Sequence, residues 1–447
     1  MNRRASLNFK FSEIIHNKAR GSSVIVCHRG PAFLKGEMNM TAESILKEAQ
    51  ALRETIVSDR RYLHTHPGTG FDIGETVEYV KKELEALGYE PKECGKAGLV
   101  ALAGGKKPGK VFLLRADMDA LPIREEADVE FASENGCMHA CGHDMHTSML
   151  LGAARLLKKH EDEIEGTVKL MFQPAEEIFE GSHDMIEAGL LENPNVDAAL
   201  MIHVMAGMPF PAGTVIVSAP GVSAPAADYF EIKVQGKGCH GSMPNTGVDP
   251  LNAAAHILIA LQEIHARELA MGDQAVMTIG TLHAGTAANA IPDTATMGGS
   301  IRTFDEETRA FLKQRLTEVS EGVAKSFRAQ AEVTFGSGCP TLVNDKELSE
   351  CADKYVKELL GEGQAFSVAQ LNAMGGGGKS SKAAGSEDFA YVSQEVSSIM
   401  LALAAGQPQK GYQYPQHHPM VKFDEDALAS GSAVYAYTAM RWLEEHK

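Results

Sequence analysis

One stretch of the chain, residues 136–146, holds two cysteines, three histidines and an aspartate. Thiolate and imidazole are the donors that bind zinc and related divalent transition metals, and a carboxylate is suited to orienting a ligating histidine. The residue types and their close spacing predict part of a metal site. This stretch cannot close such a site alone, so further carboxylates and histidines must come from elsewhere in the chain.

Polar groups that could complete the site follow three segments expected to be buried strands, at residues 111–114, 167–172 and 198–202. Open α/β sheets place their sites at the carboxyl ends of parallel strands, so we expect these groups to converge. A later candidate lies in a loop rich in proline, tyrosine and glutamine before the closing helix. The candidates are Asp119, Glu176, Glu177, His203 and, in that later loop, His417.

Five donors exceed the four of a mononuclear tetrahedral site but suit two ions about 3.5 to 4 Å apart. Glu176 is then left over, and it is suited to take a proton from the attacking water and pass it to the leaving amine. Taken alone, the two adjacent glutamates could instead favour a helix amino terminus, and His203 could be a buried core imidazole. The expected ligands are Cys141, His143, Glu177, His203 and His417.

Other residues near these donors are expected to support the site without binding metal. Asp119 and Asp144 belong to this group, as do Cys137, His139 and His146. His64 and His66 resemble ligands by their spacing, but the Pro-Gly that follows them indicates a turn. The glycine-rich residues 374–380 lack one glycine of a phosphate-binding loop, which favours a flexible loop instead.

The composition is that of an ordinary globular protein, with 447 residues, 44% hydrophobic and 23% charged. A net charge of −17 disfavours a duplex nucleic acid as partner, and no apolar run reaches the ~20 residues that span a bilayer. Seven cysteines, an odd number thinly spread, disfavour a disulfide framework. We therefore expect a cytoplasmic protein with no nucleic-acid or membrane partner.

The order of expected elements divides the chain. Residues 1–40 are basic and are expected to be a disordered extension or a misassigned start, with Met38 or Met40 as the true beginning. Helices are expected at 41–62 and 75–87. Between 222 and 336 the order strand, helix, two strands, helix, strand is the ferredoxin-like pattern, and one helix is expected over 249–269. The fold class is therefore α/β, with a catalytic domain over 41–221 and 337–447, a mixed sheet flanked by helices, and an inserted α+β domain over 222–336.

Six runs of the sequence closely resemble the metal-dependent amidohydrolases that include hippurate hydrolase, auxin-conjugate hydrolases and bacterial N-acyl-amino-acid hydrolases, relatives of aminoacylase and carboxypeptidase G. The resemblance extends in order from about residue 42 to the carboxyl terminus. The runs are Met138 to Asp144, Gln173 to Glu177, Gly238 to Gly241, Asn289 to Asp293, Gly385 to Phe389 and His417 to Pro419.

This resemblance implies two divalent ions, manganese or zinc, on the five ligands above, with Glu176 as general base. It implies that the inserted domain acts as a lid and mediates a homodimer or higher homo-oligomer. His240 would help to polarise the scissile carbonyl, and Asn289, Arg302 and Gly385 would lie near the substrate, with the arginine suited to a carboxylate.

The implied reaction is hydrolysis of an N-acyl-amino acid or a related small amide. A dipeptidase or carboxypeptidase remains the alternative, as does a catalytically silent homologue that keeps the fold. Cys239 stands where relatives commonly carry glycine, and Asn245 where they often carry a second histidine. These departures concern how a substrate fits, whereas all five expected ligands and the base are present. A serine hydrolase is disfavoured because the sequence has no Gly-x-Ser-x-Gly turn.

Overall fold

The computed structural model describes residues 41–373 and 385–447, and the structural statements below concern these residues. The expectations for residues 1–40 and 374–380 fall outside them. No helix in the described ranges is long and apolar enough to cross a bilayer.

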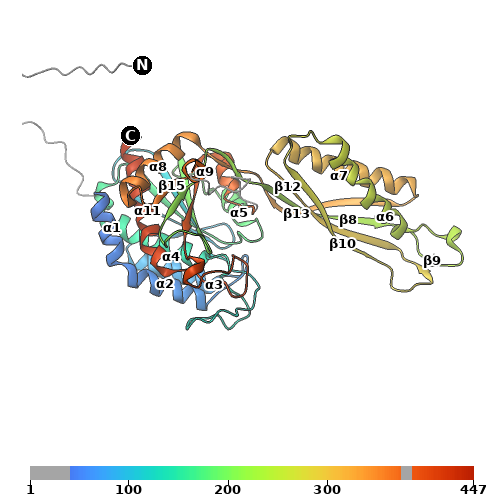
Figure 1. Ribbon diagram of the computed structural model, residues 1–447, viewed down its shortest axis with the longest axis horizontal. Helices are drawn as coiled ribbons and strands as arrows, with labels where there is room; N and C mark the ends of the chain where they lie inside the picture. The colour runs from blue at the N-terminus through green and yellow to red at the C-terminus, as the bar shows by residue number, and fades with distance from the viewer. Residues whose placement is uncertain (1–40, 374–384) are drawn as a thin grey trace, which may run out of the picture. The chain divides into compact units, whose positions relative to one another are not determined.

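The larger of two main sheets has eight strands and mixes parallel and antiparallel neighbours. Figure 1 shows this part of the molecule with the helices around it, among them α1, α4 and α11. The centre of the sheet is parallel, because β4, β3, β5 and β16 all run in one direction. In sheet order the strands are β1 (Lys92–Cys94), β2 (Gly98–Gly104), β4 (Thr167–Gln173), β3 (Val111–Asp117), β5 (Ala198–Met205), β16 (Ser397–Ala404), β6 (Val215–Val217) and β15 (Ala365–Ser367).

Both faces of this sheet are covered, which explains why its central strands read as apolar runs. On one face Leu113 and Met201 pack in a core cluster with Phe389, just before α10. On the other face Phe112 meets the ring of Trp442 from α11, with ring centroids 5.1 Å apart. All seven residues of β3 are buried, so the predicted buried strand is confirmed and extends to Asp117.

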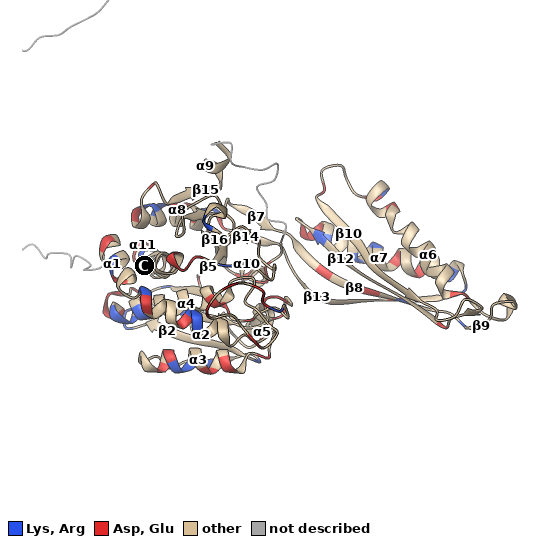
Figure 2. Cartoon of the chain, turned by 60° about the horizontal axis from the view of Figure 1, so that its bottom comes forward, with Lys and Arg blue, Asp and Glu red and all other residues tan. Residues whose placement is uncertain are grey.

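Helices flank the large sheet, and one of them, α3, carries charged residues of both signs (Figure 2). Opposite signs are interspersed there, as in an ordinary solvated surface. These helices are α1 (Ala42–Ala51), α2 (Arg53–Thr65), α3 (Gly74–Ala86), α4 (His143–Lys159), α5 (Gly181–Glu187), α8 (Lys346–Leu360), α9 (Val368–Ala373), α10 (Ala390–Glu395) and α11 (Leu428–Glu445).

Two expected helices are interrupted. The prediction of one helix over 41–62 is wrong, because α1 ends and α2 begins around Leu52, whose N–H is shared between Glu48 O and Ala49 O. The prediction over 249–269 is also wrong: α6 (Pro250–Ala260) ends early and a π-helical turn follows over Ile264–Glu268. The apolar spacing is similar on both sides of each break, so periodicity alone does not detect it.

The chain between β7 (Gly221–Ala224) and β14 (Leu342–Asn344), two short strands that pair with each other, forms a second sheet of four strands. Its order β10-β12-β8-β13, with every neighbouring pair antiparallel, is the ferredoxin-like arrangement predicted from the sequence. A separate apolar core lies between this sheet and helices α6 and α7. The remaining elements are β8 (Ala226–Gln235), β10 (Ala275–Ala284), β12 (Thr294–Thr303), α7 (Glu306–Ser326) and β13 (Gln330–Cys339).

Candidate metal centre

His143 is the first residue of α4 and points a free ring nitrogen into the site. Its Nδ1 donates to the backbone oxygen of Asp119 at 2.8 Å, which leaves Nε2 as the atom with the lone pair. That Nε2 is buried and has no hydrogen-bond partner. The turn before it needs Gly142, because its φ is +91° and an added Cβ would lie 2.4 Å from the side chain of Val204. His143 is therefore oriented as a ligand would be.

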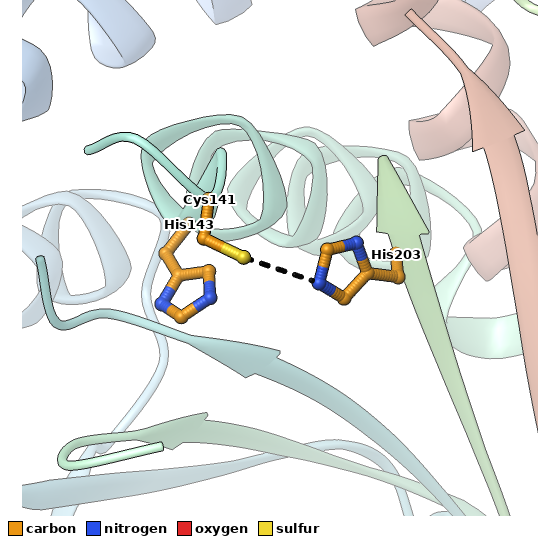
Figure 3. Close-up of side chains that lie close together, drawn as sticks. All are labelled: Cys141, His143 and His203. Atoms are coloured by element: carbon orange, nitrogen blue, oxygen red, sulfur yellow. Dashed lines mark hydrogen bonds between the residues drawn. The ribbon is translucent and has the colours of Figure 1, made fainter. Parts of the chain in front are cut away.

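His203 lies within β5, the strand that pairs with β3, and faces Cys141 (Figure 3). Its Nδ1 donates to the oxygen of Val204 at 2.7 Å, and its Nε2 lies 3.6 Å from Cys141 Sγ. Burial lowers the pKa of His203 to about 3, so the ring is neutral and its Nε2 lone pair is available. The donor atoms of Cys141, His143 and His203 all lie within 4.8 Å of one another.

Glu176 and Glu177 enter from the loop after β4. Their backbone N–H groups donate to the two carboxylate oxygens of Asp119, at 3.0 and 3.2 Å. Oε2 of Glu176 lies 3.7 Å from His143 Nε2, and Oε1 of Glu177 lies 3.8 Å from the same nitrogen. Asp119 thus holds both the loop and His143.

His417 completes the cluster from the loop before α11. Its backbone has a φ of +64°, uncommon outside glycine, and its N–H donates to the oxygen of Ala140 at 2.9 Å. This fixed backbone brings its Nε2 to 3.5 Å from Oε1 of Glu177. Donor atoms of Cys141, Glu177 and His417 form another group within 4.8 Å. The structure thus brings together all five expected ligands and Glu176.

This donor set fits divalent metal ions. His143 Nε2 and Glu177 Oε1 are buried without a hydrogen-bond partner, a state that is costly unless another group occupies the space between them. Burial raises the pKa of Glu177 to about 7 and raises the pKa of Glu176 as well. Imidazole nitrogen, thiol sulfur and carboxylate oxygen together are donors typical of zinc and neighbouring transition metals.

His146 lies beside the cluster, but both of its ring nitrogens are engaged. Its Nε2 accepts the backbone N–H of Val204 at 2.8 Å, so its Nδ1 carries the proton and donates to Asp117 Oδ1 at 2.6 Å. His146 thus connects β3 with β5, and Tyr435 connects the same two strands two residues earlier in each. The Tyr435 hydroxyl donates to Arg115 O and accepts from Ile202 N. Backbone pairing of β3 with β5 ends at Arg115, and these two side chains connect the strands where they separate.

Asp144 is the centre of a second group of buried polar side chains. Oδ2 of Asp144 accepts a hydrogen bond from Arg60 Nε at 2.7 Å and lies 2.9 Å from Nδ1 of His64. His64 therefore contacts a neighbour of His143 and not the metal donors. His66 instead stacks on Tyr62, with ring centroids 4.2 Å apart.

Cys137 and His139 also stay outside the donor groups of the described chain. Burial lowers the pKa of His139 to about 3, so this ring is neutral.

The residues expected near the substrate lie in two places. His240 and Asn289 are neighbours at the short pair formed by β9 (Cys239–His240) and β11 (Ala290–Ile291). Arg302 on β12 donates to Ser386 Oγ at 2.5 Å, and Gly385 precedes that serine. Among the described residues His240 belongs to no group of three metal donors within 4.8 Å, so the structure does not place it with the cluster.

Sequence reasoning missed three charged residues directly behind the site. Arg115, only 1% exposed, lies in a strand whose residues are all buried, and it contacts Asp117, Glu387 and Asp388. A charged residue inside an apolar strand is the signal that could have pointed to Arg115. Glu387 and Asp388 lie some 270 residues further along the chain, and no local pattern links them to it.

Comparison with known proteins agrees with this geometry. Residues 113–441 match the family model described as peptidase family M20/M25/M40. The chain is 34% identical over 401 residues to an N-acetylcysteine deacetylase of Bacillus subtilis (strain 168), covering 89% of this chain and 99% of that protein. It is 37% identical over 396 residues to the IAA-amino acid hydrolase ILR1-like 2 of Arabidopsis thaliana, covering 87% and 85%.

A solved structure of similar fold is that of a dinuclear metal binding peptidase of Bacillus subtilis from the M20 family. It superposes with a TM-score of 0.71 at 33% identity and covers 88% of this chain and 99% of that one. The match to the family model takes in all five clustered donors and Glu176. The chain belongs to peptidase family M20/M25/M40.

Proposed function

We propose that this protein is a dinuclear metal-dependent hydrolase that cleaves the amide bond of N-acyl-amino acids or related small amides. The observation that carries the proposal is the convergence of five donors with one additional carboxylate, Glu176. The names of the relatives support an amide substrate. The ligands are Cys141, His143, Glu177, His203 and His417, and the ions are manganese or zinc.

Bound ions would polarise the scissile carbonyl and make the attacking water more acidic. The chain's own contribution to proton transfer comes from Glu176. Its carboxylate takes one proton from the water as the new C–O bond forms, and delivers it to the amide nitrogen as the C–N bond breaks. The products are a carboxylic acid and a free amino acid. Asp119 keeps Glu176 in place through the backbone N–H at 3.0 Å.

A substrate panel tests this function. We expect manganese- or zinc-loaded enzyme to hydrolyse N-benzoyl-glycine and N-acetyl-amino acids faster than dipeptides, and a chelator to abolish turnover and lower the melting temperature by a few °C. Restored metal should recover both. Faster cleavage of dipeptides would favour a peptidase, and no hydrolysis of any amide by the metal-loaded protein would overturn the proposal.

The inserted domain, residues 222–336, is proposed to be a lid and the surface of a homodimer. Strand β10 is an edge of its sheet, with unpaired backbone groups that a second strand could pair. Val276 and Leu282 on that strand are 57% and 39% exposed, and Ile259 on α6 is 67% exposed. Exposed apolar side chains beside a free strand edge favour an interface between two copies. His240 and Asn289, in the same domain, are proposed to contact the substrate.

A charge on this edge should prevent association. We expect the wild-type chain of 48.0 kDa to sediment as a dimer or larger, and Val276→Asp to sediment as a monomer. Lys233→Asp on the central strand β8, which β12 separates from β10, serves as the control, since it places a carboxylate elsewhere on the same sheet. A wild-type monomer at all concentrations would refute the proposed dimer.

The location proposed for the protein is the cytoplasm. Six cysteines in the described part of the chain are free thiols, as a reducing compartment would leave them. Recovery of the activity outside the cytosolic fraction would argue against this location.

A further inference from the structure

We propose that Arg115 is a positioning residue for the reaction, and that its guanidinium sets the mutual placement of the strand ends that carry the metal donors and the base. The inference rests on the proposed function. The hydrogen bonds of this one side chain carry it.

All five N–H groups of the Arg115 guanidinium have acceptors. Nε donates to Gln173 Oε1 at 2.7 Å. Nη1 donates to Asp117 Oδ2 at 2.7 Å and approaches Met201 Sδ at 3.8 Å. Nη2 donates to Glu387 Oε1 at 2.8 Å and to Asp388 Oδ1 at 3.1 Å. A planar group with five fixed donors is thus fully used.

One set of these partners leads to His203. Asp117 accepts from Arg115 with Oδ2 and from His146 with Oδ1, and His146 in turn accepts the backbone N–H of Val204. Val204 directly follows His203, and the backbone oxygen of Val204 accepts a hydrogen bond from Nδ1 of His203. The orientation of a proposed ligand on β5 therefore depends on a side chain of β3.

Two other partners of Arg115, Gln173 and Asp388, connect the two ends of the loop that carries Glu176. Gln173, at the start of this loop, bonds to Asp388 through Nε2 at 2.6 Å. Ser182, at its end, donates its backbone N–H to Asp388 Oδ2 and its hydroxyl to Gln173 Oε1. Arg115 bonds to both Gln173 and Asp388, so it anchors the two ends of the loop together.

The alternative is that Arg115 only balances buried charge. Three carboxylates, those of Asp117, Glu387 and Asp388, surround it, and removing a buried partner from such a group is destabilising wherever it lies. A purely structural arginine would affect stability without changing metal affinity or the chemical step. That difference can be measured.

The test replaces Arg115 by lysine, which keeps the charge but has three donors around one atom in place of the planar fork. Arg155→Lys is the matched control. Arg155 forms two bonds to Asp59 and one to Glu83, is 10% exposed, and lies on α4 roughly 18 Å beyond His143 along the helix axis. Metal affinity is measured by calorimetry with Mn²⁺ or Zn²⁺, the melting temperature on metal-free protein, and kcat and KM on N-benzoyl-glycine.

We expect Arg115→Lys to weaken metal binding and to lower kcat by about tenfold or more each, with KM changed less than kcat. Arg155→Lys should lower the melting temperature while metal affinity and kcat stay near wild type. If Arg115→Lys lowers the melting temperature as Arg155→Lys does, but leaves metal affinity and kcat unchanged, Arg115 is merely structural and the inference fails.

A milder variant covers the case in which Arg115→Lys does not fold. Asp388→Asn keeps the shape but removes the charge that anchors both ends of the loop, and it should weaken metal binding in the same direction. Unchanged metal affinity in folded Asp388→Asn would then overturn the inference. Because metal affinity is measured without substrate, failure of the proposed amide hydrolysis would leave this result interpretable.

Discussion

Glu176→Gln should lower kcat by about 10²–10⁴-fold while two metal ions per subunit stay bound. The glutamine side chain keeps the shape of Glu176 but cannot accept and return a proton. Metal binding should persist because the five proposed ligands are unchanged, and the backbone N–H of residue 176 still donates to Asp119. The measurement combines steady-state kinetics on N-benzoyl-glycine with elemental analysis of the purified variant.

Glu187→Gln is the control for this substitution. Glu187 ends α5 and its side chain is 71% exposed, so the same chemical change there should leave kcat near wild type. Near-normal activity of Glu176→Gln would show that another group moves the proton, and loss of metal in that variant would make Glu176 a ligand.

Cys141→Ala should weaken metal binding by more than the ~10–100-fold that follows loss of a group behind the ligands. Sγ of Cys141 lies 3.6 Å from His203 Nε2 and shares a donor group with Glu177 and His417, so it faces ligands from both sides of the cluster. Alanine removes the sulfur and little else. Elemental analysis and calorimetry with Mn²⁺ or Zn²⁺ provide the measurement.

Cys351→Ala provides the comparison, since Cys351 is a free thiol on α8 and belongs to none of the donor groups in the described chain. It should keep wild-type metal content. Should Cys141→Ala also keep it, Cys141 must be removed from the set of proposed ligands.

The sequence predicted the main features of the fold because these depend on local patterns. Buried strands such as β3 read as apolar runs, and the inserted domain shows its order of elements directly. Glu177 and His203 were found because each follows or ends an expected strand, and strand ends meet at one edge of a parallel sheet. Cys141 and His143 were found from the dense group of donor residues at 136–146, and His417 from a loop before the closing helix. His203 lies inside β5 rather than after it, but it still faces the site.

What the sequence could not predict depends on contacts between distant segments. Nothing in the residues near Arg115 indicates that Asp388, 273 positions later, accepts a hydrogen bond from the Arg115 guanidinium. The break at Leu52 was missed for a different reason, since the helical spacing of apolar residues is similar on its two sides. The role of His146 also required coordinates, because only the bond from Val204 N–H shows that its Nε2 is occupied.

The bridge made by Tyr435 has a consequence for the order in which the protein folds. Its hydroxyl bonds to Arg115, 320 positions away, at the point where β3 and β5 separate. Closing so long a loop is entropically unfavourable and slow, and the whole inserted domain lies within it. The metal centre is thus expected to be among the last parts of the molecule to assemble. During refolding, metal binding should therefore lag behind secondary structure formation.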